Sequence, residues 1–280
     1  MEKAIKRYFP IFVLPTMIAF TLGFIIPFVE GVYLSFCKFT TVNDAKFIGF
    51  ANYAKVFADE TFVHAFWYTA AFTVVSVILI NVLAFAVALL LTKGFKGTNI
   101  FRTVFFMPNL IGGIVLGYIW QLLLNGILMK FSRTLTYSST YGFWGLIIFM
   151  CWQQIGYMMI IYIAGIQNIP GELIEAAEID GATKWQILKK VTIPMVMPSI
   201  TVCTFLTLTN SFKLFDQNLA LTNGEPSKMS EMLALNIFNT FYGRTGYEGV
   251  GQAKAVIFFI LVTVIALTQN YLTRRKEVQQ

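Results

Sequence analysis

Charged residues are scarce in this chain. They make up 12% of its 280 residues, whereas hydrophobic residues make up 57%. A soluble domain carries about 25% charged residues, so half that share predicts a protein solvated mainly by lipid. The mean hydropathy of +0.68 agrees. The net charge of +7 does not indicate nucleic acid, because the basic residues stand in short groups between apolar runs rather than on one face.

Cysteine and histidine are also scarce, which argues against several kinds of site. The three cysteines, Cys37, Cys151 and Cys203, are odd in number and widely spaced. Small core residues are therefore favoured over a disulfide or a metal site. The lone histidine, His64, stands at the start of an apolar run, where a polar anchor is the favoured interpretation. A single histidine gives no basis for a Ser/His/Asp set.

The chain has no G-x-x-x-x-G-K-[ST] loop. Because that motif cradles nucleotide phosphates, we do not expect this chain to bind ATP or to be an enzyme, and we expect no metal or cofactor on it. Energy for any transport would then come from an ion gradient or from another protein.

Long apolar runs are abundant instead. A membrane-spanning helix needs about 20 apolar residues, and six runs meet this length. They lie near Phe9–Phe36, Ala65–Leu91, Val104–Leu124, Trp144–Gln167, Met195–Leu221 and Ala255–Leu272. The first run is too long for the apolar region of a signal peptide and lacks a small-residue cleavage site. We therefore expect it to be retained and to be broken or tilted around Pro15 and Pro27.

These runs predict an all-α membrane protein of six transmembrane helices. Residues 1–64 form the first helix and an external loop, 65–273 a core of five helices with a cytoplasmic loop at 169–193, and 274–280 a tail. Lys and Arg are more frequent in the connecting segments on the side of the two termini than in the opposite ones. By the positive-inside rule, both termini are predicted to be cytoplasmic.

The loop between the fourth and fifth runs predicts a helix–turn–helix on the cytoplasmic face. Pro170 and Gly171 end the preceding run, and acidic side chains follow in the first turn of a new short helix, where the helix dipole favours them. Asp180-Gly181 breaks that helix. A second short helix is expected over 184–191, and Pro194 opens the fifth run. The alternative is an ordinary amphipathic loop that packs on its own bundle.

The same loop resembles the EAA loop of ABC importer permeases. That pattern reads EAA, three residues, Gly, nine residues, then I-x-L-P. Here Glu175-Ala176-Ala177 is followed by Gly181 and then by Val191-x-Ile193-Pro194, with conservative departures at Val191 and Ile193. In the family this loop forms coupling helices that dock into a groove on the ATP-binding subunit. The resemblance implies that contact for Glu175, Ala176, Ala177, Asp180 and Gly181.

Three further segments resemble carbohydrate-type permeases of the maltose, glycerol-phosphate and multiple-sugar family. They are Phe47–Tyr53, Phe101–Pro108 and Asp216–Pro226. The resemblance covers most of the chain from Phe47 onward and points to the first permease of a pair. It implies a type I ABC importer permease fold in the bacterial cell membrane, crossing it several times.

The implied function is uptake of a sugar, an oligosaccharide being favoured, by an ATP-driven and binding-protein-dependent importer. The implied partners are a second permease, two copies of a cytoplasmic ATP-binding subunit that hold ATP and Mg, and an external sugar-binding protein. Glycerol phosphate or another polyol is an alternative cargo. An ion-coupled secondary transporter is a more distant alternative, but it leaves the EAA loop unexplained and calls for internal repeats that are not visible here.

Candidate substrate residues come from polar positions inside apolar runs, which are costly in a membrane. Lys213 and Asp216 are three apart, so we expect them to lie on one helix face and to pair, as a structural ion pair or as part of a site. By resemblance, this part of the fifth run lines the sugar site. The full candidate set is Asn210, Ser211, Lys213, Phe215, Asp216, Gln153 and Tyr157. A G-x-x-x-G pair, Gly113 and Gly117, predicts close helix packing.

Overall fold

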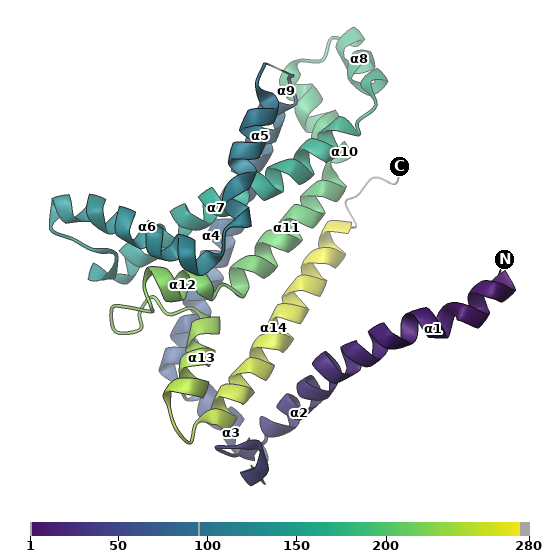
Figure 1. Ribbon diagram of the computed structural model, residues 1–280. Helices are drawn as coiled ribbons and strands as arrows, with labels where there is room; N and C mark the ends of the chain where they lie inside the picture. Colours follow the sequence, from purple (N-terminus) through teal and green to yellow (C-terminus); the bar gives the residue numbers. More distant parts are fainter. Residues whose placement is uncertain (1, 95, 275–280) are drawn as a thin grey trace. The chain divides into compact units, whose positions relative to one another are not determined.

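The computed structural model describes residues 2–94 and 96–274 and is almost entirely helical (Figure 1). The N-terminal part holds α1 (Glu2–Phe20), η1 (Thr21–Ile25), α2 (Ile26–Leu34), β1 (Cys37–Lys38), η2 (Val42–Asp44), β2 (Lys46–Phe47) and α3 (Ala51–Phe57). The middle holds α4 (Glu60–Leu91), α5 (Thr98–Phe106), η3 (Met107–Leu110), α6 (Gly113–Leu128), η4 (Met129–Phe131), η5 (Leu135–Tyr137) and α7 (Ser139–Gln167). The remainder holds α8 (Gly171–Ile179), α9 (Lys184–Ile187), η6 (Leu188–Thr192), α10 (Ile193–Met195), α11 (Met197–Phe212), α12 (Asp216–Leu221), α13 (Leu233–Gly243) and α14 (Glu248–Arg274).

The chain divides into two compact units. The first comprises Met1–Glu60 and Ile237–Phe259, and the second Thr61–Asn236 and Ile260–Gln280. The predicted tail at 274–280 lies outside the described residues except for Arg274, which ends α14.

The first unit contains a small two-stranded hairpin next to the first helical run. Strands β1 and β2 pair antiparallel. The buried Asn52 side chain donates hydrogen bonds to the carbonyl oxygens of Ser35 (2.9 Å) and Cys37 (2.8 Å), and the Tyr53 hydroxyl lies 2.7 Å from the Ser35 hydroxyl. These contacts give the Asn-Tyr pair of the Phe47–Tyr53 segment a structural role, because they tie α3 to the end of α2.

The turn before β2 is closed by Asp44. Its carboxylate accepts hydrogen bonds from the backbone amides of Thr40 and Thr41, both at 3.0 Å. These amides hold the pKa of the Asp44 carboxyl below its ordinary value, since hydrogen bonds to the charged form favour it. The turn is therefore built around an ionised side chain.

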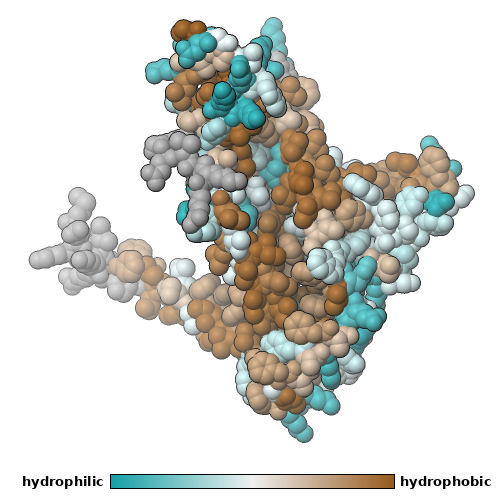
Figure 2. Space-filling view, turned by 180° about the vertical axis from the view of Figure 1, so that it is seen from behind, coloured by the Kyte–Doolittle hydropathy of each residue, from teal (hydrophilic) through white to brown (hydrophobic). Residues whose placement is uncertain are grey.

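The second unit is built on α7, the most deeply buried of the long helices in the described chain. Two thirds of its membrane-length window (67%) is buried, against 28% for α4. Buried Leu146, Met150 and Tyr162 of α7 join Ile80 of α4 in one apolar cluster. Figure 2 shows hydrophilic residues gathered at the top of the view, where α8 and α9 lie, above a broad hydrophobic surface. That surface is what a helix bundle presents to lipid.

The number of apolar helices agrees with the sequence, but two of the predicted runs are broken. Within residues 2–94 and 96–274, five helices are long and apolar enough to span a membrane, or six if one bent pair counts as a span. The predicted third span, Val104–Leu124, is divided: α5 and η3 end before Gly112, and α6 begins at Gly113. Pro108 and the Gly112-Gly113 pair explain the break, because proline and glycine weaken a helix interior. The predicted fifth span, Met195–Leu221, is interrupted between Phe212 and Asp216.

Candidate coupling hairpin and transport pathway

The predicted helix–turn–helix at 169–193 is present in the structure. Helix α8 ends at Ile179, and the chain turns at Gly181, whose φ of +76° is a left-handed conformation that favours glycine. The amide of Ala182 donates to the carbonyl oxygen of Ala177 (3.0 Å), which satisfies a helix-terminal acceptor. The next helix starts with a capping box between Thr183 and Gln186.

The second half of the hairpin differs from the prediction. Helix α9 covers only Lys184–Ile187 and continues through the wide turn η6 into α10, so the helical run does not end at Val191. Pro194 lies inside this run rather than at the start of the fifth span. The run Lys184–Met195 meets α11 at a bend of 69°. Pro198, near the first residue of α11, fits the position where proline is tolerated.

The hairpin exposes apolar side chains. Ile179 is 86% exposed and Trp185 68% exposed. Of the predicted coupling residues, Glu175, Ala176, Asp180 and Gly181 are exposed and Ala177 is half-buried. Figure 1 shows α8 at one end of the second unit, beyond α10. An isolated tip that carries a small-residue helix and an exposed isoleucine has the features of a docking element.

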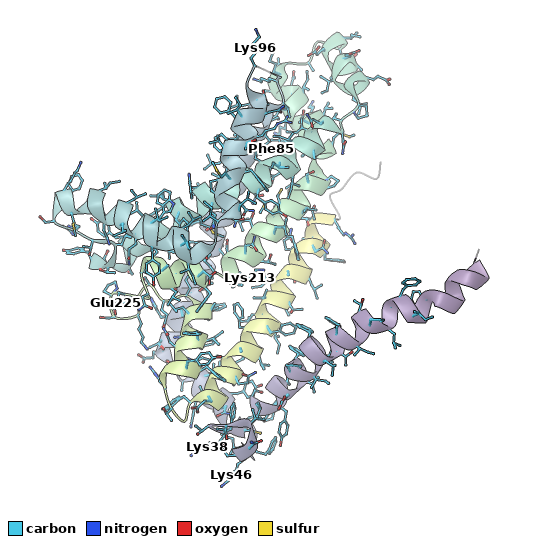
Figure 3. All side chains as sticks on the ribbon, in the orientation of Figure 1. Lys38, Lys46, Phe85, Lys96, Lys213 and Glu225 are labelled. Carbon is cyan, nitrogen blue, oxygen red and sulfur yellow. The ribbon has the colours of Figure 1, made fainter. Side chains whose placement is uncertain are left out.

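The break after α11 separates two predicted partners. Lys213 follows the last residue of α11 as its C-cap and Asp216 begins α12, so the prediction that they share one helix face is wrong. Both side chains are exposed, and the structure over residues 2–94 and 96–274 shows no ion pair between them. Figure 3 shows Lys213 beside this break. Short polar residues precede it: the Ser211 hydroxyl is buried without a hydrogen-bond partner among the described residues.

The other candidate residues occupy different environments. Asn210, Phe215 and Tyr157 are half-buried. Gln153 is buried, and both ends of its amide are used: Nε2 donates to the carbonyl oxygen of Ile111 (3.4 Å), and Oε1 accepts from Gln217 (3.0 Å). Gln153 therefore joins α7 to the break before α6 and to α12. Its partner Gln217 is not among the residues predicted for the site.

Glycines bring these broken helices close together. A Cβ at Gly117 would lie 2.6 Å from the Cβ of Ala220, and one at Gly113 would lie 3.1 Å from the Cβ of Asp216. The predicted close packing of the G-x-x-x-G pair is thus confirmed, with α12 as the partner helix. At Gly156 of α7, a Cβ would overlap the carbonyl oxygen of Phe105. This contact sets the crossing of α5 and α7.

The structure contains a polar cluster inside the bundle that the sequence pattern does not predict. The Tyr162 hydroxyl donates to Oδ1 of Asn81 (2.7 Å), and Nδ2 of Asn81 donates to the Thr207 hydroxyl (3.3 Å). The cluster joins α7, α4 and α11. Buried polar groups in an apolar bundle need such partners, so it specifies how these three helices pack.

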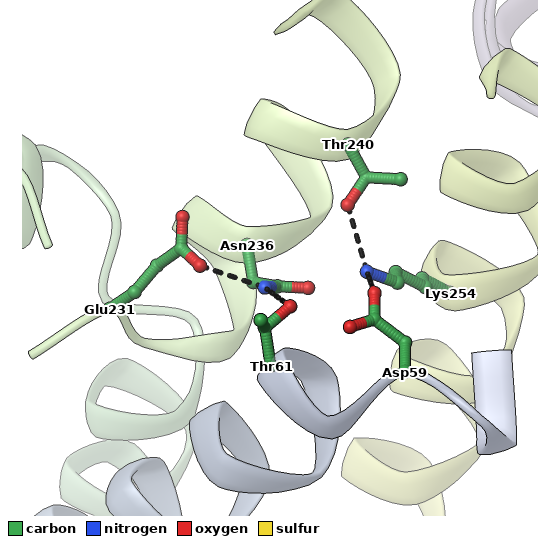
Figure 4. A network of polar contacts seen from close by, with 6 residues as sticks. All are labelled: Asp59, Thr61, Glu231, Asn236, Thr240 and Lys254. Atoms are coloured by element: carbon green, nitrogen blue, oxygen red, sulfur yellow. Dashed lines mark hydrogen bonds and ion pairs between the residues drawn. The ribbon is translucent and has the colours of Figure 1, made fainter. Parts of the chain in front are cut away.

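The connection between α12 and α13 is held by Asn218. Its side chain donates to the Ser230 carbonyl oxygen (2.8 Å) and accepts from the Met232 amide (2.9 Å). His64 lies 2.9 Å from the Met229 carbonyl oxygen, which gives the lone histidine a structural contact. In Figure 4, the Asn236 amide donates to Glu231 (2.7 Å) and to Thr61 (3.3 Å).

The first unit has a polar cluster of its own. Lys254 of α14 is fully buried and donates to Asp59 and Thr240, at 2.7 Å and 2.8 Å (Figure 4). A buried ammonium group is tolerated only when it is paired. This ion pair fixes the residue before α4 against α13 and α14.

Comparisons with known proteins agree with one another. A family model described as "Binding-protein-dependent transport system inner membrane component" matches residues 80–278. The "Probable starch degradation products transport system permease protein AmyD" of Thermoanaerobacterium thermosulfurigenes is 42% identical, over 96% of this chain and 94% of that protein. The "Multiple sugar-binding transport system permease protein MsmF" of Streptococcus mutans is 29% identical, over 99% of both chains.

Solved structures share the fold. A chain of a bacterial ABC transporter involved in the import of the acidic polysaccharide alginate superposes with a TM-score of 0.82 at 23% identity and covers 98% of both chains. A chain of the MetNI methionine ABC transporter gives a TM-score of 0.57 at 24% identity and covers 77% of this chain and 96% of that one.

Proposed function

We infer that this chain, which belongs to the family of binding-protein-dependent transport system inner membrane components, forms half of the pore of an ATP-driven oligosaccharide importer. The hairpin of α8 and α9, with its exposed Ile179 and the turn at Gly181, is the observation that carries this proposal. It supplies a docking element for an energy-providing subunit in a chain whose sequence has no nucleotide-binding loop.

The cargo class follows from the relatives. AmyD is named for transport of starch degradation products and MsmF for multiple sugars. We propose that this chain transports maltooligosaccharides. Its pathway would combine apolar ring surfaces with short polar groups, which suits sugars, because they present both apolar faces and hydroxyls.

The working assembly that we propose has four kinds of subunit. This chain pairs with a second permease, two ATP-binding subunits hold ATP and Mg, and an external binding protein delivers the sugar. On this chain Glu175, Ala176, Ala177, Asp180 and Gly181 would form the contact with one ATP-binding subunit. The chain itself would carry no cofactor and perform no bond chemistry, and both termini would lie in the cytoplasm.

The substrate pathway is proposed at the α11–α12 break. Asn210, Ser211, Lys213, Phe215 and Asp216 surround that break, with exposed charges and a buried hydroxyl that has no partner in the described chain. Tyr157 would contribute a ring from α7. Gln153 would act as a positioning residue, because its amide holds Ile111 and Gln217.

The test is uptake by the full complex in proteoliposomes. Labelled maltotriose is supplied outside with the binding protein, and ATP inside. We expect accumulation that requires both ATP and the binding protein and that unlabelled maltohexaose competes away. Accumulation of a polyol phosphate instead of maltotriose would contradict the oligosaccharide assignment, and uptake driven by an ion gradient without ATP would contradict the importer class.

A further inference from the structure

A pocket of about 350 Å³ lies between α5 and α7, outside the candidate substrate set. Its lining includes Arg102, Thr103 and Phe106 from α5 and Ile160, Ala164 and Gln167 from α7. The two helix backbones touch at Phe105 and Gly156, and the pocket opens beyond that crossing, toward the end of α7 from which the coupling hairpin continues.

Arg102 is the unusual residue of this pocket. Its Nε atom is buried and has no hydrogen-bond partner among the described residues. Nor does Arg102 form an ion pair in the part of the chain that the structure describes. An unpaired cation between membrane helices is costly, and such residues commonly mark substrate pathways. Arg102 as a whole is half-buried, so it is the Nε–H of its guanidinium that lacks an acceptor, and a ligand in the pocket can supply one.

The pocket continues the proposed pathway along one face of α7. Starting from Gln153 and Tyr157, steps of three and four residues reach Ile160, Ala164 and Gln167, which is the spacing of a single helix face. Tyr157 and Ala164 are seven residues apart, or about 10 Å along the helix axis. The Phe106 ring at the pocket wall lies 6.4 Å from the Tyr157 ring, so the two positions adjoin.

The chemistry of the lining suits a sugar. The guanidinium of Arg102 and the side chains of Thr103 and Gln167 offer hydrogen bonds to hydroxyl groups, and Phe106 offers an apolar ring face. We propose that this pocket is a second oligosaccharide subsite on the coupling-hairpin side of the pathway, with Arg102 as its main donor. The proposal rests on the function proposed above and adds to it a site for longer chains.

The test is protection of a cysteine in the assembled, nucleotide-free complex. Thr103→Cys is introduced together with Cys151→Ser, because Cys37 and Cys203 are buried. The rate of labelling by a polar maleimide is measured with maltose and with maltohexaose. We expect maltohexaose to slow labelling about fivefold and maltose to have little effect, because only a long chain reaches both positions.

Arg102→Gln in the same background should raise the maltohexaose concentration needed for protection about tenfold, since a hydrogen bond from a charged donor is lost. Arg274→Gln, which removes the same charge at an exposed position outside the pocket, should leave protection unchanged.

Three outcomes would overturn the subsite. The first is a labelling rate that maltohexaose does not change in a complex that transports it. The second is protection by maltohexaose that is unchanged in Arg102→Gln. The third is protection that depends on the anionic lipid content rather than on the sugar. The last would identify a lipid headgroup site. A complex that takes up no maltooligosaccharide at all fails the proposed function itself, and uptake is therefore measured first.

Discussion

At the scale of single residues, several buried polar groups in each unit are held by specific hydrogen-bond partners. Lys254 donates hydrogen bonds to Asp59 and Thr240, and Asn81 is hydrogen-bonded to Tyr162 and Thr207. Asn218 donates a hydrogen bond to the loop before α13. Seven buried side-chain atoms in the described chain have no hydrogen-bond partner, and the hydroxyl of Ser211 and the Nε of Arg102 are two of them. Both lie along the proposed pathway, where a ligand or water can complete them.

The ion pair of Lys254 yields a stability prediction at this scale. Lys254→Met removes the fully buried cation that pairs with Asp59, which should destabilise the complex by about 3–5 kcal/mol. Thermal unfolding in detergent measures the loss. The double variant Lys254→Met/Asp59→Asn should recover part of it, and a double variant less stable than the single one would contradict the ion-pair account.

At the scale of helices, close backbone contacts decide the arrangement. Helix α5 touches α7 at Gly156, and α6 touches α12 at Gly117. Gly156→Ala would push a methyl group into the carbonyl oxygen of Phe105, and overpacking of this kind costs about 1–3 kcal/mol. Gly126→Ala in α6 is the matched control, because nothing lies within 4 Å of that position. Unfolding curves that respond equally to both changes would refute the crossing contact.

The sequence predicts the helices well and their interruptions poorly. Length and apolarity mark the first, second, fourth and sixth spans, because a bilayer demands both. The breaks at Gly112 and Lys213 are not predicted, because the length of an apolar run measures hydropathy and does not show whether the helix is continuous. A spacing argument such as that for Lys213 and Asp216 fails once the helix between them ends. The sequence predicts Gln153 as a polar residue inside an apolar run, but its partners Ile111 and Gln217 depend on tertiary contacts.

At the scale of the whole molecule, the α8–α9 hairpin is the device that would link ATP to transport. Its turn can be predicted from Asp180-Gly181 alone, since a positive φ favours glycine. What the structure adds is the exposure of Ile179 and Trp185, which no sequence pattern measures. Because the helical run of the hairpin continues through η6 into α10, a displacement of its tip can be transmitted to the bend before α11.

The most direct test of this coupling is ATP hydrolysis by the reconstituted complex, stimulated by maltotriose-loaded binding protein, in Gly181→Asp against Gly94→Asp. Both glycines are exposed, have a positive φ and have open space around them, so the backbone strain is matched. With assembly of both complexes verified by size-exclusion chromatography, we predict that Gly181→Asp loses the stimulation at least tenfold while Gly94→Asp stays within about twofold of wild type. Full stimulation in Gly181→Asp would contradict the account.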